Sequence, residues 1–168
     1  MNLEGVTVKL EITGLGIIFY SPKHAHHIAE GEDYFSTHFI TEEQVQEHIQ
    51  KGTIVGFGTG SPGAFALHFH DGYPDESELP KFEFKLRLGL NCSGGLVCIK
   101  DLYDLMDWHK DCPKNQELPL PDGLYHVTLC SNAPASGILG ENQIIHVYLQ
   151  QLDALPYLAK RGIPTLCT

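Results

Sequence analysis

The sequence predicts a mainly β protein, an antiparallel two-sheet β-sandwich or a small barrel with one or two short helices. Short runs of alternating apolar and polar residues recur along the chain, Gly and Pro separate these runs, and no regular strand–helix alternation occurs. In the clearest run, Phe82–Leu90, Phe84 and Leu86 share one face while Glu83 and Lys85 share the other. This pattern is typical of a strand with one buried face.

Further strands are expected on both sides of the first helix. Apolar residues at every second position indicate a half-buried strand over residues 6–12, and a continuous apolar run indicates a second strand over residues 17–20. Residues 54–57, 64–70 and 96–99 are apolar segments of strand length that are bounded by Gly, Pro or polar turns.

Two helices are expected. Thr41 and Gln44 have the spacing of a capping box, so a helix begins there and ends near Lys51, before a glycine. The spacing of apolar residues indicates a second, short helix over residues 100–110. The tail, residues 152–168, is a helix-like turn broken by two prolines.

A β-hairpin near the C-terminus is the segment around which the chain is expected to organise. The turn Pro121-Asp122-Gly123 leads into an alternating run that ends at Cys130, and a loop through Gly140 leads to a second run, Asn142–Leu149. Tyr125 lies on the apolar face of the first run, so one face of the hairpin packs on the core.

Length and composition indicate one globular domain, residues 1–168. Apolar residues make up 42% of the chain and charged residues 19%, which argues against disorder. The net charge is −10, so the surface repels nucleic acid phosphates and anionic membranes and favours a basic protein or a cation. The same acidity is also explained by solubility alone.

The cysteines predict a protein with reduced thiols. Cys92, Cys98, Cys112, Cys130 and Cys167 are odd in number and widely spaced, and no CxxC motif occurs. Two of them, Cys98 and Cys130, lie in apolar runs and are expected to be small buried hydrophobic residues. The N-terminal residues lack the basic start and apolar run of a signal peptide. We therefore expect a cytoplasmic protein.

Ten histidines are the richest supply of reactive side chains. His68 and His70 stand two apart in a predicted strand and share one face. His126 and His146 lie on the matching faces of the two hairpin strands, so a register that pairs them would make them neighbours. His24, His26 and His27 cluster in a loop of unassigned role.

Part of this arrangement resembles a cupin, a β-barrel family that holds a divalent metal with His-x-His, a carboxylate and a later Pro-x-Gly-x-x-His. This resemblance implies four metal ligands, His68, His70, Asp75 and His126. The last of these ends the motif Pro121-Asp-Gly-Leu-Tyr-His126. Imidazoles with a carboxylate suit iron, manganese, nickel or zinc. Other positions of the two motifs depart from the family pattern, namely Pro62, Asn115 and Cys130. The same residues also have an explanation without a metal: His68 and His70 form a polar strand face, and Pro121-Asp-Gly is an ordinary way to enter a strand.

A broader resemblance is to small bacterial β-sandwich proteins of the immunity and nuclease-inhibitor type, including the competence-associated nuclease inhibitor. It rests on Leu120-Pro-Asp-Gly-Leu-Tyr-His-Val127, a loop, and Gly140-Glu-Asn-Gln-Ile-Ile-His-Val-Tyr148. This resemblance implies binding and masking of a protein partner, such as a basic toxin or nuclease, without catalysis. The acidic net charge agrees with it, because electrostatic steering favours such encounters.

Four aspartates mark a candidate contact surface. If residues 100–110 are helical, Asp101, Asp104, Asp107 and Asp111 form an acidic stripe beside Trp108. Aromatic residues rimmed by acids are typical of binding surfaces, but a solvated helix face has the same pattern. We take Asp101, Asp104, Asp107 and Trp108 as the candidate partner-binding residues.

The function that the sequence favours is that of a non-enzymatic cytoplasmic binding protein of the immunity or inhibitor type, without a cofactor. The alternative is a cupin-like metalloprotein or metalloenzyme that acts on a small molecule. A metal pocket requires the histidine strands to converge, whereas a binding protein requires an accessible acidic surface.

Overall fold

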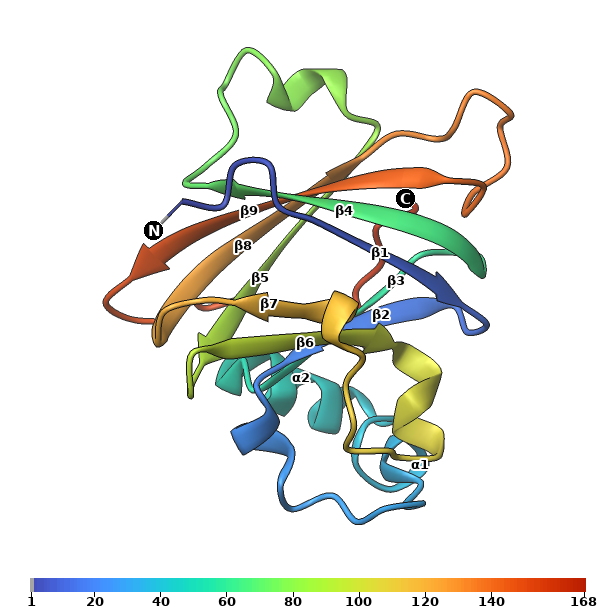
Figure 1. The fold of residues 1–168 in the computed structure, drawn as a ribbon, viewed down its shortest axis with the longest axis vertical. Helices are drawn as coiled ribbons and strands as arrows, with labels where there is room; N and C mark the ends of the chain where they lie inside the picture. The colour runs from blue at the N-terminus through green and yellow to red at the C-terminus, as the bar shows by residue number, and fades with distance from the viewer. Residues whose placement is uncertain (1) are drawn as a thin grey trace.

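The computed structural model describes residues 2–168, which form two β-sheets packed face to face (Figure 1). The five-stranded sheet has the order β1 (Thr7–Ile12), β4 (Gly63–Asp71), β9 (Gln143–Leu152), β8 (Gly123–Ser131) and β5 (Phe84–Cys92). The four-stranded sheet has the order β3 (Ile54–Gly58), β2 (Gly16–Tyr20), β6 (Leu96–Asp101) and β7 (Glu117–Pro119). The predicted two-sheet sandwich is confirmed.

Strand pairing is antiparallel except between β4 and β9, which run parallel. The predicted hairpin is confirmed, since β8 and β9 pair directly. Its register differs from the one that would join two histidines: His126 is opposite Gln150, and His146 is opposite Cys130. His146 instead pairs with His68 across the parallel β4–β9 junction.

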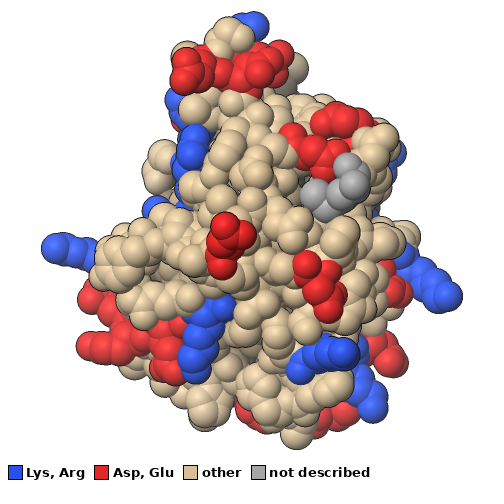
Figure 2. Space-filling model, turned by 90° about the vertical axis from the view of Figure 1, so that its left-hand side faces the viewer, with Lys and Arg blue, Asp and Glu red and all other residues tan. Residues whose placement is uncertain are grey.

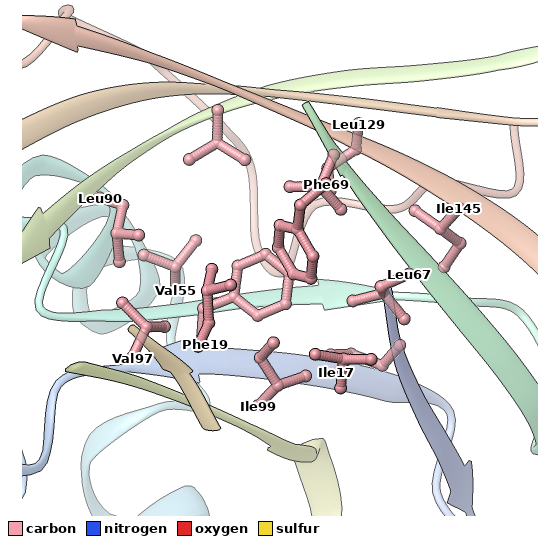
Figure 3. Packing of buried hydrophobic residues seen from close by; sticks show 14 of the residues in the cluster. Ile17, Phe19, Val55, Leu67, Phe69, Leu90, Val97, Ile99, Leu129 and Ile145 are labelled. Atoms are coloured by element: carbon pink, nitrogen blue, oxygen red, sulfur yellow. The ribbon is translucent and has the colours of Figure 1, made fainter. Parts of the chain in front are cut away.

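The main core lies between the two sheets (Figure 3). Ile17, Phe19 and Ile99 point from the four-stranded sheet toward Leu67 and Phe69 of the five-stranded sheet. All five side chains are at most 2% exposed. This interdigitation is the usual way in which two stacked sheets exclude water.

A second core covers the outer face of the four-stranded sheet. It is formed beneath 3-10 helix η1 (Pro22–Ala25), helices α1 (Tyr34–His38) and α2 (Glu42–Lys51), and 3-10 helix η3 (Leu102–Met106). The four-stranded sheet is therefore buried on both faces, which explains why every residue of β2 is apolar or small. No helix of the described residues is long and apolar enough to cross a membrane.

The predicted helix at Thr41 is confirmed with its cap. The Thr41 side chain accepts from the backbone N–H of Gln44, and the Gln44 side chain accepts from the backbone N–H of Thr41, both at 3.1 Å. Val45 and Ile49 bury the apolar face of α2, and Gly52 ends the helix with a φ of 65°. Glycine adopts this left-handed conformation at little cost.

Several predicted boundaries are wrong. Residues 100–110 are not a helix, because β6 continues to Asp101 and only the 3-10 turn η3 follows. Strand β5 begins at Phe84 rather than Phe82, because the chain before it forms 3-10 helix η2 (Leu79–Lys81) and Phe82 packs against a histidine. Helix α1, strand β7 and 3-10 helix η4 (Lys114–Gln116) were not predicted. The tail is irregular and contributes one parallel bridge, between Thr165 and Gly58.

The expectation of fully reduced thiols is wrong for one pair. Cys98 and Cys112 form a disulfide that spans 14 positions in sequence. Cys92 and Cys130 are buried free thiols, and burial raises the pKa of both. Cys98 was therefore correctly expected to be buried, but it is cross-linked rather than free.

Candidate functional site

Two acidic segments lie side by side at the end of the molecule that carries η1 and η3. We call residues 29–33 and 101–111 together the acidic end. The backbone N–H of Gly31 donates to the carbonyl of Trp108 at 2.7 Å, and the N–H of Trp108 donates to the carbonyl of Glu32 at 3.1 Å. The two segments contain seven acidic residues and one lysine, a net charge of −6 out of −10 for the whole chain.

Backbone amides hold the carboxylates of the first segment in place. Glu30 accepts from the N–H of Lys110 at 2.7 Å, Glu32 from Ala29 at 3.0 Å, and Asp33 from Ser36 at 3.0 Å. The bond from Lys110 lowers the pKa of Glu30, and the bond from Ser36 lowers the pKa of Asp33. The lowered pKa values keep Glu30 and Asp33 ionised at neutral pH, and the backbone hydrogen bonds fix the positions of all three carboxyl groups.

A buried lysine supports the second segment from inside. Lys100 is 2% exposed, and its Nζ donates to the carbonyl of His109 and lies 4.8 Å from the Trp108 ring centroid. Burial lowers the pKa of Lys100, while Asp104 and Asp111 oppose this shift. The lysine, the paired backbones and the Cys98–Cys112 disulfide together fix the acidic end on the four-stranded sheet.

The four predicted contact residues lie together but differ in accessibility. Asp107 is 73% exposed at its side chain and can meet a partner. Asp104 is half-buried, and burial raises its pKa while Lys100 opposes the shift. Asp101 accepts from the N–H groups of Thr13, Gly14 and Tyr103, so its carboxylate holds turns together.

Trp108 is 1% exposed and packs in the second core, so it is not a surface residue. The sequence did not mark Glu30, Glu32 and Asp33 as contact residues. Their clustering in one polar segment was the available signal, but only the pairing with residues 107–110 places them beside the aspartates.

A second acidic region lies at the opposite end of the molecule. The segment that links β4 to β5 carries Asp75, Glu76 and Glu78, all exposed. Figure 2 shows acidic side chains gathered at the top of the molecule, where Figure 1 places this segment. Removing charges from this second region therefore serves as a control for removing charges from the acidic end.

Histidines cluster on the outer face of the five-stranded sheet. His70 Nε2 and His146 Nδ1 are 2.9 Å apart, and His70 Nδ1 is 3.0 Å from a Glu4 carboxylate oxygen. The rings of His68 and His146 are 5.4 Å apart, and His70 stacks on Tyr148 at 4.5 Å. The shared face of His68 and His70 is as predicted, while His146 is a partner that follows only from the β4–β9 register.

The four proposed metal ligands do not converge. His126 lies on β8, which is separated from the strand of His68 and His70 by β9, and it contacts Tyr73 Oη at 2.9 Å instead. Asp75 lies in the exposed segment between β4 and β5. Within residues 2–168, no three His, Cys, Asp or Glu side chains are arranged to hold a metal ion.

Comparisons with known proteins identify the fold. No family model matches the sequence, and no curated protein matches it significantly. The crystal structure of ComJ from Bacillus subtilis, an inhibitor of the DNA degrading activity of NucA, is similar over 90% of this chain and 99% of that chain, with a TM-score of 0.51 and 13% identity. A structure described as crocagin biosynthetic gene J is similar over 85% of this chain and 96% of that chain, with a TM-score of 0.53 and 12% identity. The resemblance expected from the sequence is confirmed at the level of the fold.

Proposed function

We propose that this protein is a non-enzymatic inhibitor-type protein that binds and masks a basic protein partner, such as a nuclease, through its acidic end. The observation that carries the proposal is the set of carboxylates of Glu30, Glu32 and Asp33, each held by a backbone N–H group. Similarity to the fold of ComJ, a nuclease inhibitor, supports the class of function. A cytoplasmic location remains part of the proposal.

The chemistry of the acidic end suits a cationic partner. Fixed carboxylates lose little side-chain freedom on binding, so less of the interaction energy is spent on ordering them. Their charge also speeds the encounter with a basic surface, an effect that falls with ionic strength. The same negative charge repels nucleic acid. A nuclease has a basic surface where it binds its own nucleic acid substrate, so the acidic end would bind that surface.

The experiment compares two variants with equal loss of charge. Glu30→Gln/Asp107→Asn removes two carboxylates from the acidic end, and Asp75→Asn/Glu76→Gln removes two from the opposite end. Wild type and both variants are immobilised and exposed to extract of the producing cells, and retained proteins are identified by mass spectrometry. The retained protein is then purified, and its DNA-degrading activity is measured with increasing amounts of each variant.

We expect a basic protein to be retained by wild type and by the Asp75→Asn/Glu76→Gln variant, and to be inhibited at a one-to-one ratio. Loss of two contact charges from the acidic end should weaken inhibition by roughly tenfold or more. Equal inhibition by both variants would refute the acidic end as the contact surface. A retained partner whose DNA-degrading activity is unaffected would refute the inhibitor function.

A further inference from the structure

Three of the four edge strands in the two sheets are partly covered or very short. On β5, the N–H of Asn91 donates to the carbonyl of Gly52 at 2.8 Å. On β3, the N–H of Gly58 donates to Pro164 and its carbonyl accepts from Leu166, so the C-terminal tail covers this edge. Strand β7 has only three residues and ends in a proline. Proteins protect sheet edges in these ways because an open edge can pair with another chain.

The fourth edge strand is β1, at the margin of the five-stranded sheet (Figure 1). The carbonyl of Val6 accepts from the N–H of Phe69, and in an antiparallel ladder every second residue continues this pairing with β4. The backbone groups of the residues in between, Thr7, Lys9 and Glu11, therefore point away from β4. Among residues 2–168 these groups have no hydrogen-bond partner, so β1 is an open edge.

The side chains of Lys9 and Glu11 make no ion pair within the described chain. Both are exposed, and their cross-strand neighbours on β4 are Ala66 and Ala64, which carry no charge. A cavity of about 500 Å³, lined in part by this stretch of β1 and by residues 115–116 of η4, leaves open space beside the strand. The edge therefore presents a lysine, a glutamate and free backbone groups to a further strand.

The order of the two charges is self-complementary. When two copies of β1 pair antiparallel about Leu10, Lys9 of each copy lies opposite Glu11 of the other. These are the residues whose backbone groups face the open edge, so each pair exchanges both of its hydrogen bonds. Opposite charges directly across a ladder stabilise it, and like charges destabilise it. A register shifted by two residues in either direction places Lys9 opposite Lys9 or Glu11 opposite Glu11, so the charges select one register.

We propose that β1 pairs antiparallel with β1 of a second copy of this chain, so that the two five-stranded sheets join into one continuous sheet across a two-fold axis. A lysine on an edge strand normally discourages the addition of another strand. Here each lysine meets a glutamate, and this match is a property of the strand paired with itself. The carboxylates of Glu30 and Asp107 are not on β1, so the proposal does not depend on the partner contacts proposed above.

The test measures the mass of the full chain in solution by analytical ultracentrifugation, at low salt and from about 1 to 300 µM. Lys9→Glu and Glu11→Lys each place like charges opposite each other, and Lys9→Glu/Glu11→Lys restores opposite charges. Lys85→Glu is the matched control for Lys9→Glu, because Lys85 is exposed on β5 at the other edge of the same sheet. Glu11→Lys reduces the net negative charge of the chain, so it would strengthen an association that total charge controlled.

We expect a reversible dimer for wild type and for Lys85→Glu. Each single reversal should weaken the dimer by roughly tenfold or more, because two attractive cross-strand pairs become repulsive, and the double exchange should restore it to within about threefold. Wild type that stays monomeric over the whole range would overturn the proposal. A dimer that the single reversals leave unchanged would overturn the assignment to β1, and a double exchange that restores nothing would overturn the register.

Amide hydrogen exchange of wild type reads the backbone contacts without any substitution. The N–H groups of Lys9 and Glu11 should exchange more slowly as the concentration rises through the dimer range. The N–H of Leu10 should keep its rate, because it is already paired with β4. Rates for Lys9 and Glu11 that are independent of concentration would overturn pairing through this edge.

Discussion

Reduction of the Cys98–Cys112 disulfide should destabilise the protein by about 3 kcal/mol. The bond closes a loop of 15 residues, counted from a separation of 14 positions. In the chain-entropy account, closing a loop of this length in the unfolded state is worth about 3 kcal/mol. Reduction keeps both side chains, so the second core, in which Cys98 is fully buried, loses no volume.

The assay is urea unfolding with and without a reductant, followed by the fluorescence of the single tryptophan. With a urea slope of about 2 kcal/mol/M, the midpoint should fall by about 1.5 M, and the melting temperature by roughly 6–12 °C. Cys167→Ser serves as the control, because Cys167 is a free cysteine outside the disulfide.

A thiol count on denatured, unreduced protein gives an independent check. Three reactive thiols are expected, because two of the five cysteines are cross-linked. Five reactive thiols, together with an unfolding midpoint that is the same with and without reductant, would refute the predicted stabilisation by the disulfide. The same count on protein taken rapidly from cells tests the proposed cytoplasmic location. That compartment keeps most thiols reduced, so five reactive thiols in this sample would support the location, and three would contradict it.

Three further predictions concern stability. Thr41→Ala removes the cap of α2 and should cost about 1 kcal/mol in urea unfolding; an unchanged midpoint would show that the cap is dispensable. Gly140→Ala should lower the free energy of unfolding by about 3 kcal/mol or more, because φ is 84° and the added Cβ would lie 2.2 Å from the Pro62 carbonyl oxygen. Gly137→Ala is the control: φ is a similar 77°, the added Cβ would meet open space, and the loss should be only about 1 kcal/mol. Equal losses of stability in the two variants would contradict the predicted clash. Burial, then the charges of its histidine neighbours, lowers the pKa of His146, so unfolding takes up a proton and stability falls as the pH drops below the unfolded value of about 6.5. Unfolding midpoints between about pH 5 and pH 8 should therefore fall less steeply in His146→Gln than in wild type, and identical profiles would exclude this contribution.

Local sequence patterns predicted the strands of the five-stranded sheet well, because strands such as β1 and β4 bury alternate residues. The run Phe84–Leu90 and the hairpin strands carry the signal of one buried face, and the capping pair Thr41 and Gln44 marks a helix start. The parallel β4–β9 pair left no such signal. The two strands are about 80 positions apart in sequence and are not joined by a tight turn, so no local turn motif indicates that they pair.

The candidate site was predicted only in part for the same reason. Asp107 was correctly expected at the surface, but Trp108 was placed there by assuming a helix. The chain instead leaves β6 in a 3-10 turn, and Lys100 and Tyr20 pack against the tryptophan ring from the sheet. Glu30 joins the site because its carboxylate accepts a hydrogen bond from the backbone N–H of Lys110, which is 80 positions away in sequence.

The position of β9 has a consequence for synthesis of the chain. Of the strands in the five-stranded sheet, β9 is translated last, and it lies in the middle of that sheet between β4 and β8 (Figure 1). Until β9 is released, the β1–β4 and β5–β8 pairs present open edges to other nascent chains, which is a known route to aggregation. The sheet therefore closes only after translation of residues 143–152, and chaperone demand should peak just before that point. The same arrangement suits a split protein, in which a separate β9 peptide completes and reports the assembly of the remainder.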